Sequence, residues 1–368
     1  MVDQVTQDAI RRATELAQRE TTALDNRAMA ELEKMYREAA ADIQRIIQSS
    51  AGRDGTVSMQ AMSELLVQID ARLKKLAEQR NESLKRAIWE AASLAAWAAT
   101  DAAIAAMLYL AATRIPRMAS GRANMSTPNV GLEISVGVSM QTGISITSEA
   151  ASAVYEFLGP DGLRLSDRIW RLDRLAREVL ADAIRQSVIQ GDGAAAAALD
   201  FLKRGEPAPA DITAQLGKNQ GVRLGQAALE LLTGEGGTPL YNAMRVFRTE
   251  INRAHIEAYR KSIQRIDGAI GTRFLLSPLH PEHDICDLHA EANLYGLGKG
   301  VYPFGKSPLP AHPNTISYEV VVFDDEVSEA DRAGKESASD ALQRLTPEQQ
   351  IGVLGKKKYE QRTVGLSN

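Results

Sequence analysis

The sequence predicts a mainly α-helical protein with a long N-terminal helical hairpin and a small α+β domain near the C-terminus. Apolar residues recur every three to four positions through the first 115 residues, which is typical of amphipathic helices. Two further helical patterns follow at 163–204 and 239–266, and then the chain becomes irregular. A chain of 368 residues is also longer than single hydrophobic cores usually grow. We therefore expect more than one folding unit.

The N-terminal pattern divides into two helices. A glycine-containing break with a Ser cap, residues 51–58, separates the first helix from a second that continues to Thr113, and Pro116 then ends the run. We expect these helices to pair as an antiparallel hairpin that forms a domain of residues 1–118. The apolar stripe of the first helix consists of Met29, Leu32, Met35, Tyr36, Ile43, Ile46 and Ile47.

Residues 88–112 are alanine-rich and apolar over about the length that a membrane span needs. Asp101 lies at the centre of this segment, and an acidic group costs about 2.5 to 3.5 kcal/mol at that depth. We therefore favour a buried helix over a membrane-active or ejected segment, and expect no stable membrane insertion. Small side chains would let another helix approach closely, at Ala91, Ala95, Ala98 and Ala102.

Between residues 130 and 147 the pattern changes to alternation of apolar and small or polar residues. Alternation of this kind predicts a β-hairpin, here with its turn at 141–143. We expect it to form part of a connecting domain, residues 119–162.

The third predicted domain covers residues 163–368. It begins with the helix at 163–204, with Ser166 as the expected N-cap, and a Pro-rich joint follows at 205–211. After the helix at 239–266 we expect short strands at 272–276 and 317–323 around a loop-rich segment. A last short helix should begin at Thr346-Pro347-Glu348, where a cap residue precedes proline.

Composition excludes several functional classes. The formal net charge of -4 gives no global basic field for nucleic acid. Cys286 is the only cysteine, so no internal disulfide can form, and the N-terminus has no export signal, so we expect synthesis in a reducing cytoplasm. The glycines near residue 236 lack the Lys-Ser/Thr of a phosphate-binding loop, which argues against a nucleotide-driven motor.

A cluster of histidines around the cysteine suggests zinc. All five histidines lie between positions 255 and 312, and imidazole and thiolate are the ligands that zinc prefers. We expect Cys286, His289 and His312 to bind one ion, with His283 or His280 as the fourth ligand. The alternative is a polar loop held by hydrogen bonds alone.

A second polar group, Arg248, Asn252 and His255, shares one face of the helix at 239–266, because the spacing is i, i+4 and i+7. We expect this stripe to hydrogen-bond the irregular loop that follows. The enzymatic alternative would make His255 a general base oriented by Asn252. No nucleophile motif lies nearby, so we favour the structural role.

The C-terminal basic group consists of Lys356, Lys357, Lys358 and Arg362. It could touch DNA phosphates or an acidic partner, although so few contacts give only weak, non-specific binding to DNA. A solvated basic tail is the reading we favour.

Four separated blocks together resemble the Mu F-like family of phage head morphogenesis proteins. They are a helical lead-in at 165–191, the Arg-Thr-Glu helix at 247–259, an Asp-x-Cys element with a closing His-Pro-Asn at 283–314, and a Leu-Gly and basic-aromatic ending at 348–361. The family commonly continues His-Pro-Asn with Cys-Arg-Cys. This chain has Thr315, Ile316 and Ser317 there, so a metal role of those cysteines does not transfer.

The resemblance implies a minor capsid protein of a tailed bacteriophage, without enzymatic activity. Such a protein acts in procapsid assembly at or near the portal, resides in the virion, and associates with the portal, scaffold or major capsid protein. It would contact packaged DNA only non-specifically. We also expect self-association, because the N-terminal helices offer more apolar surface than a lone hairpin buries.

Two other functional classes remain open. One is a metal-dependent nuclease of the His-Asn-His kind, built on His283, His289, His312 and Asn314 around Cys286. The other is an internal head protein that is ejected into the host envelope through the alanine-rich helix.

Overall fold

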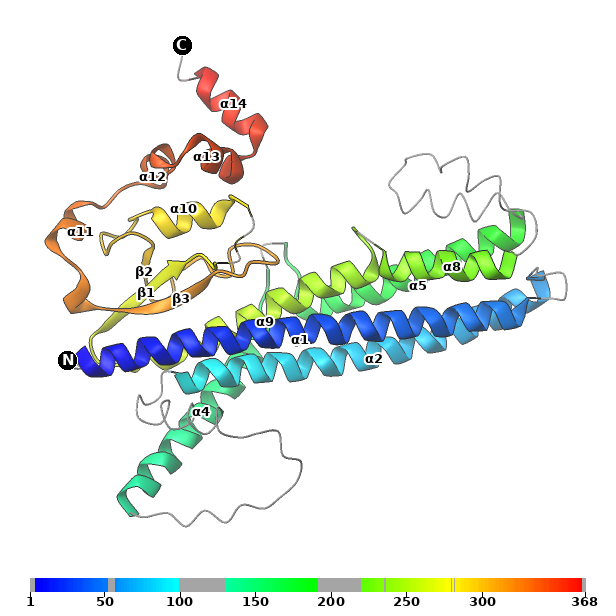
Figure 1. Cartoon of the computed structure of the whole chain (residues 1–368), viewed down its shortest axis with the longest axis horizontal. Helices are drawn as coiled ribbons and strands as arrows, with labels where there is room; N and C mark the ends of the chain where they lie inside the picture. The colour runs from blue at the N-terminus through cyan, green and yellow to red at the C-terminus, as the bar shows by residue number, and fades with distance from the viewer. Residues whose placement is uncertain are drawn as a thin grey trace. The chain divides into compact units, whose positions relative to one another are not determined.

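The computed structural model describes residues 4–51, 57–98, 130–159, 161–190, 220–234, 236–278, 280 and 282–365. It is mostly helical with one small C-terminal sheet, which confirms the predicted fold class (Figure 1). The chain divides into two compact units. The sheet unit comprises Met1–Leu24, Ile88–Val154 and Arg248–Asn368, and the bundle unit comprises Asp25–Ala87 and Tyr155–Phe247.

The predicted N-terminal helices are α1 (Gln4–Ser50) and α2 (Met59–Ala98). Ser58 caps α2, since its hydroxyl accepts the Ala61 N–H at 3.2 Å. Within the bundle unit Arg72 contacts Asp42 and Arg86 contacts Glu31, each at 2.7 Å. The later residue of α2 contacts the earlier residue of α1, so the two helices are antiparallel, as expected. The predicted continuation of the second helix from 99 to 113 lies outside the described residues.

Among the described residues, three further helices lie in the bundle unit. They are α5 (Leu165–Gln190), α8 (Gln220–Thr233) and the start of α9 (Pro239–Ile263). α5 begins before Ser166, so the predicted cap residue is wrong. The reason is local: the Asp167 carboxylate accepts the Arg164 N–H at 2.9 Å and closes the first turn one residue earlier. The end of the predicted helix at 191–204 and the joint at 205–211 lie outside the described residues.

A buried ion pair ties α5 to α2 in the same unit. Arg80 is 2% exposed and contacts Asp173 at 2.8 Å. Arg80 also lies beside the buried Tyr36 of α1, where burial raises the pKa of the phenol. The arginine therefore links three helices through one charged group.

The predicted β-hairpin at 130–147 is wrong: this segment lies in one helix, α4 (Val130–Glu156). In a strand Ile144 and Ile146 would share a face, yet Ile144 is 54% exposed and Ile146 is fully buried. Ile146, Ala150 and Val154 are all buried at a spacing of four, which is the helical period. Packing on this stripe outweighed the weak strand preference of the alternating residues.

Small residues allow close helix contacts in the sheet unit. Ala91 and Ala95 of α2 are fully buried, and the Ser262 hydroxyl of α9 contacts the Ala96 carbonyl at 3.2 Å. Close approach of another helix to this alanine face was expected, although the side chains of Ala98 and Ala102 lie outside the description. Among the described helices, none has the length and apolar character needed to cross a membrane.

The sheet has strand order β2-β1-β3 and is antiparallel throughout. Its strands are β1 (Ala269–Leu275), β2 (Val301–Pro303) and β3 (Tyr318–Phe323). β1 and β3 lie close to the predicted strands, whereas β2 was not predicted. The remaining short helices are α10 (Ile285–Glu291), η1 (Asp324–Glu326), α11 (Glu329–Ala333), α12 (Ala338–Arg344), α13 (Pro347–Leu354) and α14 (Lys356–Gly365). α13 begins at the predicted cap, Thr346 followed by proline.

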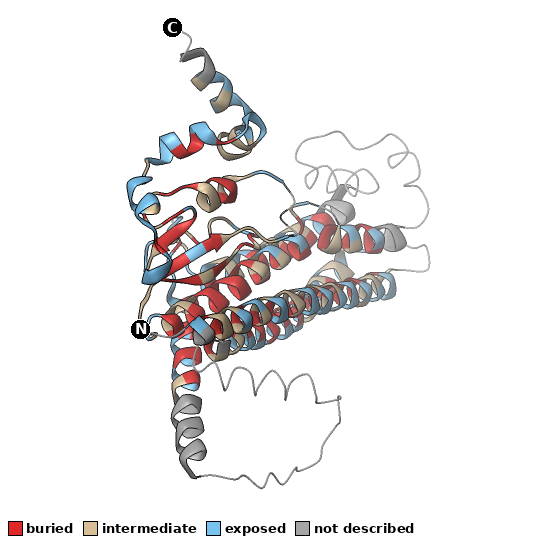
Figure 2. Cartoon of the chain, turned by 60° about the vertical axis from the view of Figure 1, so that its left-hand side comes forward, coloured by how far each residue is buried: buried red, intermediate tan, exposed pale blue. Residues whose placement is uncertain are grey.

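In the sheet unit, buried residues lie on the N-terminal part of α1, on α9 and on the sheet (Figure 2). The buried Tyr259 hydroxyl accepts the Val321 N–H of β3 at 2.9 Å and lies 3.1 Å from the Thr14 hydroxyl of α1. Arg260 binds the buried Glu319 of β3 through two contacts, at 3.0 and 2.5 Å. These contacts fix α9 against the sheet, and α9 in turn positions the loop that carries the candidate site.

Candidate metal centre

The candidate site is organised by the start of α10. Asp284 is the N-cap of this helix: one carboxylate oxygen, Oδ1, accepts the Cys286 N–H at 2.7 Å. Asp287 completes the capping box by accepting the Asp284 N–H at 2.9 Å. This arrangement fixes the orientation of the Asp284 carboxylate and leaves its second oxygen, Oδ2, free to face the neighbouring loop.

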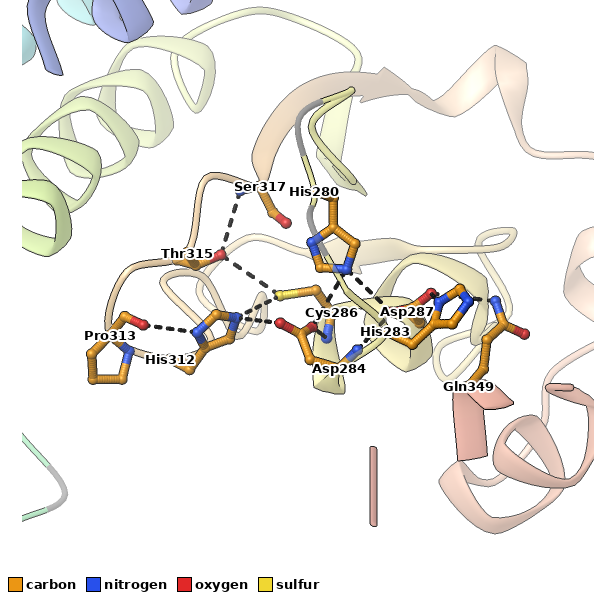
Figure 3. Close-up of polar contacts among 10 residues, drawn as sticks. All are labelled: His280, His283, Asp284, Cys286, Asp287, His312, Pro313, Thr315, Ser317 and Gln349. Atoms are coloured by element: carbon orange, nitrogen blue, oxygen red, sulfur yellow. Dashed lines mark hydrogen bonds and ion pairs between the residues drawn. The ribbon is translucent and has the colours of Figure 1, made fainter. Parts of the chain in front are cut away.

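That loop connects β2 to β3 and brings His312 to the cysteine (Figure 3). His312 Nε2 lies 3.2 Å from Cys286 Sγ and 2.9 Å from Asp284 Oδ2. Thr315 Oγ1 lies 3.6 Å from the same sulfur. Asp284, Cys286 and His312 are therefore three metal-ligand side chains whose donor atoms converge within 4.8 Å of one another.

The polar face of α9 holds this loop. Asn252 donates to the carbonyls of Thr315 and Ser317, at 3.0 and 3.3 Å. Arg248 reaches the side-chain oxygen of Asn314 at 3.3 Å. Both residues thus make the contacts expected of the predicted stripe.

His255, the third residue of that stripe, does not contact the loop. It is buried and lies 2.8 Å from the Thr21 hydroxyl of α1. Burial lowers the pKa of the imidazole to about 4, because desolvation penalises the charged form. Asn252, committed to the loop, does not orient His255 as a general base. The expectation that His255 binds the loop was wrong because His255 lies about two turns beyond Arg248 along α9, where α1 packs instead of the loop.

A second group of polar side chains surrounds Asp287. His283 Nδ1 lies 2.8 Å and Gln349 Nε2 3.3 Å from Oδ1, while His280 Nε2 lies 3.2 Å from Oδ2. His280 and Asp287 form a second convergent set with Asp284. Gln349 belongs to α13, so this group fastens α13 to α10.

The structure changes the predicted zinc set. Cys286 and His312 meet as expected, but His283 pairs with Asp287 instead. His289 lies outside both convergent groups: its Nδ1 is 3.3 Å from the Tyr302 hydroxyl and its ring packs on Phe274. His289 lies one turn after Cys286 on α10, and its ring contacts Phe274 of β1 and Tyr302 of β2 instead of the cysteine.

Asp284 was not predicted as a ligand. Its signal in the sequence was the Asp-x-Cys pattern at a helix start, since an N-cap carboxylate lies next to the side chain two residues later.

The thiol is not arranged as a nucleophile. Burial raises the pKa of Cys286 to about 11, and the Thr315 and Ser317 hydroxyls offset only part of this effect. Reactive cysteines instead require a lowered pKa and partial exposure. The donor types in the cluster, a carboxylate, a thiol and an imidazole, are nevertheless those that bind zinc-class cations.

The predicted basic residues lie on α14, away from this cluster. Lys356, Lys357 and Lys358 are exposed, and Arg362 contacts the Ser339 hydroxyl at 3.4 Å.

No family model matches the sequence, and neither the curated proteins nor the solved structures include a match to the chain.

Proposed function

We propose that the chain is a minor capsid protein of the Mu F-like kind that acts in head morphogenesis of a tailed bacteriophage. It works by binding other head components at or near the portal vertex, and not by catalysis. The portal, scaffold and major capsid proteins are the partners, and the virion is its final location.

One observation supports this proposal beyond the resemblance itself. Three of the four resembling blocks are distant in sequence, yet their own residues contact one another within the sheet unit. Asn252 of the second block holds the carbonyl of Thr315, directly after the third block, and Arg248 binds Asn314 within it. Gln349 of the fourth block binds Asp287 of the third. These contacts place the three blocks in one compact unit, as a resemblance to a single family domain requires.

The geometry gives less support to the nuclease alternative. His289 is packed between aromatic rings, and burial lowers its pKa. His283 is occupied by Asp287, so of the three proposed nuclease histidines only His312 lies in the convergent cluster with Cys286. We expect no nicking of supercoiled plasmid with Mg²⁺ or Mn²⁺. Nicking that His312→Ala removes and His289→Ala retains would contradict the non-enzymatic proposal.

Partner binding is tested by co-expressing the full chain with its proposed partner, a phage portal protein. The proposal predicts that the two proteins co-elute as a complex in size-exclusion chromatography. The triple variant Lys356→Gln/Lys357→Gln/Lys358→Gln reports whether α14 takes part. The variant Lys74→Gln/Lys75→Gln/Lys85→Gln is a charge-matched control on exposed positions of α2. Separate elution from the portal, scaffold and major capsid proteins in turn would overturn the proposal.

A further inference from the structure

We propose that Asp284, Cys286 and His312 bind one divalent cation of the zinc class, which fastens the β2–β3 loop to the start of α10. This donor set differs from one that uses His289 and His283. The inference does not depend on the proposed assembly function, because it concerns only side chains within the sheet unit.

Two of the three distances between donor atoms are close to those around such an ion, and the third is no more than 4.8 Å. With zinc bonds of about 2.0 to 2.3 Å to oxygen, nitrogen and sulfur, donor atoms in a tetrahedral site are about 3.4 to 3.6 Å apart. His312 Nε2 lies 3.2 Å from Sγ and 2.9 Å from the Asp284 oxygen. A widening of a few tenths of an ångström would admit the metal. Side-chain rotation can supply this, since His312 and Asp284 are each only partly buried.

The hydrogen bonding of His312 points the same way. Nδ1 lies 2.9 Å from the Pro313 carbonyl oxygen, which can only accept, so Nδ1 carries the proton. Nε2 then presents a lone pair to the Asp284 carboxylate, another acceptor, at 2.9 Å. Two acceptors at this distance require a proton or a cation between them. Metal-binding histidines commonly donate their other N–H to a backbone carbonyl in the same manner.

The neighbouring group around Asp287 is a weaker candidate. Both Asp287 oxygens already receive hydrogen bonds or ion-pair contacts, from His283 and Gln349 on one side and from His280 and the Asp284 N–H on the other. These contacts use the lone pairs that a metal would need. By contrast, Asp284 uses Oδ1 for its helix cap and directs Oδ2 at His312.

Hydroxyl groups line a further side of the site. Thr315 Oγ1 is 3.6 Å from the sulfur, and Thr315 is only 2% exposed. Ser317 is fully buried beside the same thiol, and its hydroxyl has no other partner among the described residues. A buried hydroxyl without another partner suits a site whose fourth ligand is a water molecule held by Thr315 and Ser317.

The test uses the full chain, purified without an affinity tag, stripped with chelator and titrated with Co²⁺ as a spectroscopic probe. We expect one equivalent to bind with a thiolate-to-cobalt charge-transfer band, and Zn²⁺ to displace it. Cys286→Ser should abolish the band. His312→Gln and Asp284→Asn should weaken binding by more than about 100-fold, beyond the usual effect of outer-shell changes.

His283→Gln and His289→Gln are the matched controls, since these residues lie on or beside the same helix but outside the proposed donor set. Both should keep the band and the affinity. Absence of the band from the wild-type chain would overturn the proposal even if a ligand variant failed to fold. So would loss of binding in either control equal to that in His312→Gln.

Discussion

The ion pair between Arg260 and Glu319 gives the sharpest test of how α9 is joined to the sheet. The Arg260 side chain is 13% exposed and that of Glu319 is 1% exposed, and two contacts at 3.0 and 2.5 Å join them. Among the described residues, Arg260→Met would leave the buried carboxylate with the Ser307 hydroxyl as its one remaining side-chain partner. Removing one partner of a buried pair costs about 3 to 5 kcal/mol. The adjacent Lys261 pairs with Glu149 at 3.2 Å, but these side chains are 34% and 49% exposed, so Lys261→Met should cost about 0 to 1 kcal/mol.

Hydrogen exchange of the β3 amides is the suitable assay, because a chain with two compact units need not unfold in one transition. Arg260→Met should speed exchange at β3 by about 100-fold to 1,000-fold or more, at about 1.4 kcal/mol per factor of ten. Lys261→Met should change it little. The double variant Arg260→Met/Glu319→Gln should recover part of the loss, since it no longer buries an unpaired charge. Equal effects of the two single variants, or no recovery in the double variant, would refute this reasoning.

Three further predictions concern His255 and the basic residues of α14. His255 has a folded pKa of about 4 against 6.5 when unfolded, so the unfolded chain binds more protons between these values and stability falls as pH drops from about 6.5 toward 4. The free energy of unfolding should change by about 3 kcal/mol over this range, at about 1.4 kcal/mol per pKa unit. Chemical denaturation at several pH values should show that the stability of His255→Gln depends less on pH than that of the wild-type chain. An unchanged pH dependence would contradict a buried, neutral imidazole. The change of the exposed lysines 356–358 to glutamine should leave the melting temperature unaltered. If α14 contacts DNA, the same change should reduce the slope of log binding constant against log salt concentration by about 2.7, at about 0.9 per phosphate contact. Fluorescence anisotropy with duplex DNA measures this slope. Retained binding with an unchanged slope would exclude α14 as the contact.

The long amphipathic patterns in the sequence predicted the long helices correctly. The pairing of α1 with α2, the extent of α9 and the start of α13 all follow from periodicity and capping, which are local properties. The alternation at 130–147 predicted a β-hairpin where the structure has a helix. The helix is favoured by the buried stripe of Ile146, Ala150 and Val154, whose packing partners lie elsewhere in the chain. β2 has three residues, too few for any periodic signal, and exists because β1 supplies its hydrogen bonds.

The candidate site was predictable in part. The histidine cluster around Cys286 located the region, and Cys286 and His312 do converge. Spacing alone could not separate His289 from Asp284, since both lie within three residues of the cysteine. The choice depends on the helix cap, which turns Asp284 toward the loop, and on Phe274 and Tyr302, which hold His289 at the sheet.

The most direct test of the assembly function is incorporation into procapsids. The chain would be co-expressed with its proposed partners, the portal, scaffold and major capsid proteins, and the particles would be purified by sedimentation and quantified by mass spectrometry. The proposed function predicts that the chain sediments with the procapsids at a low, fixed ratio to the major capsid protein, and that this ratio falls when the portal protein is omitted. Procapsids that assemble normally while the chain stays entirely in the unassembled fraction would contradict it.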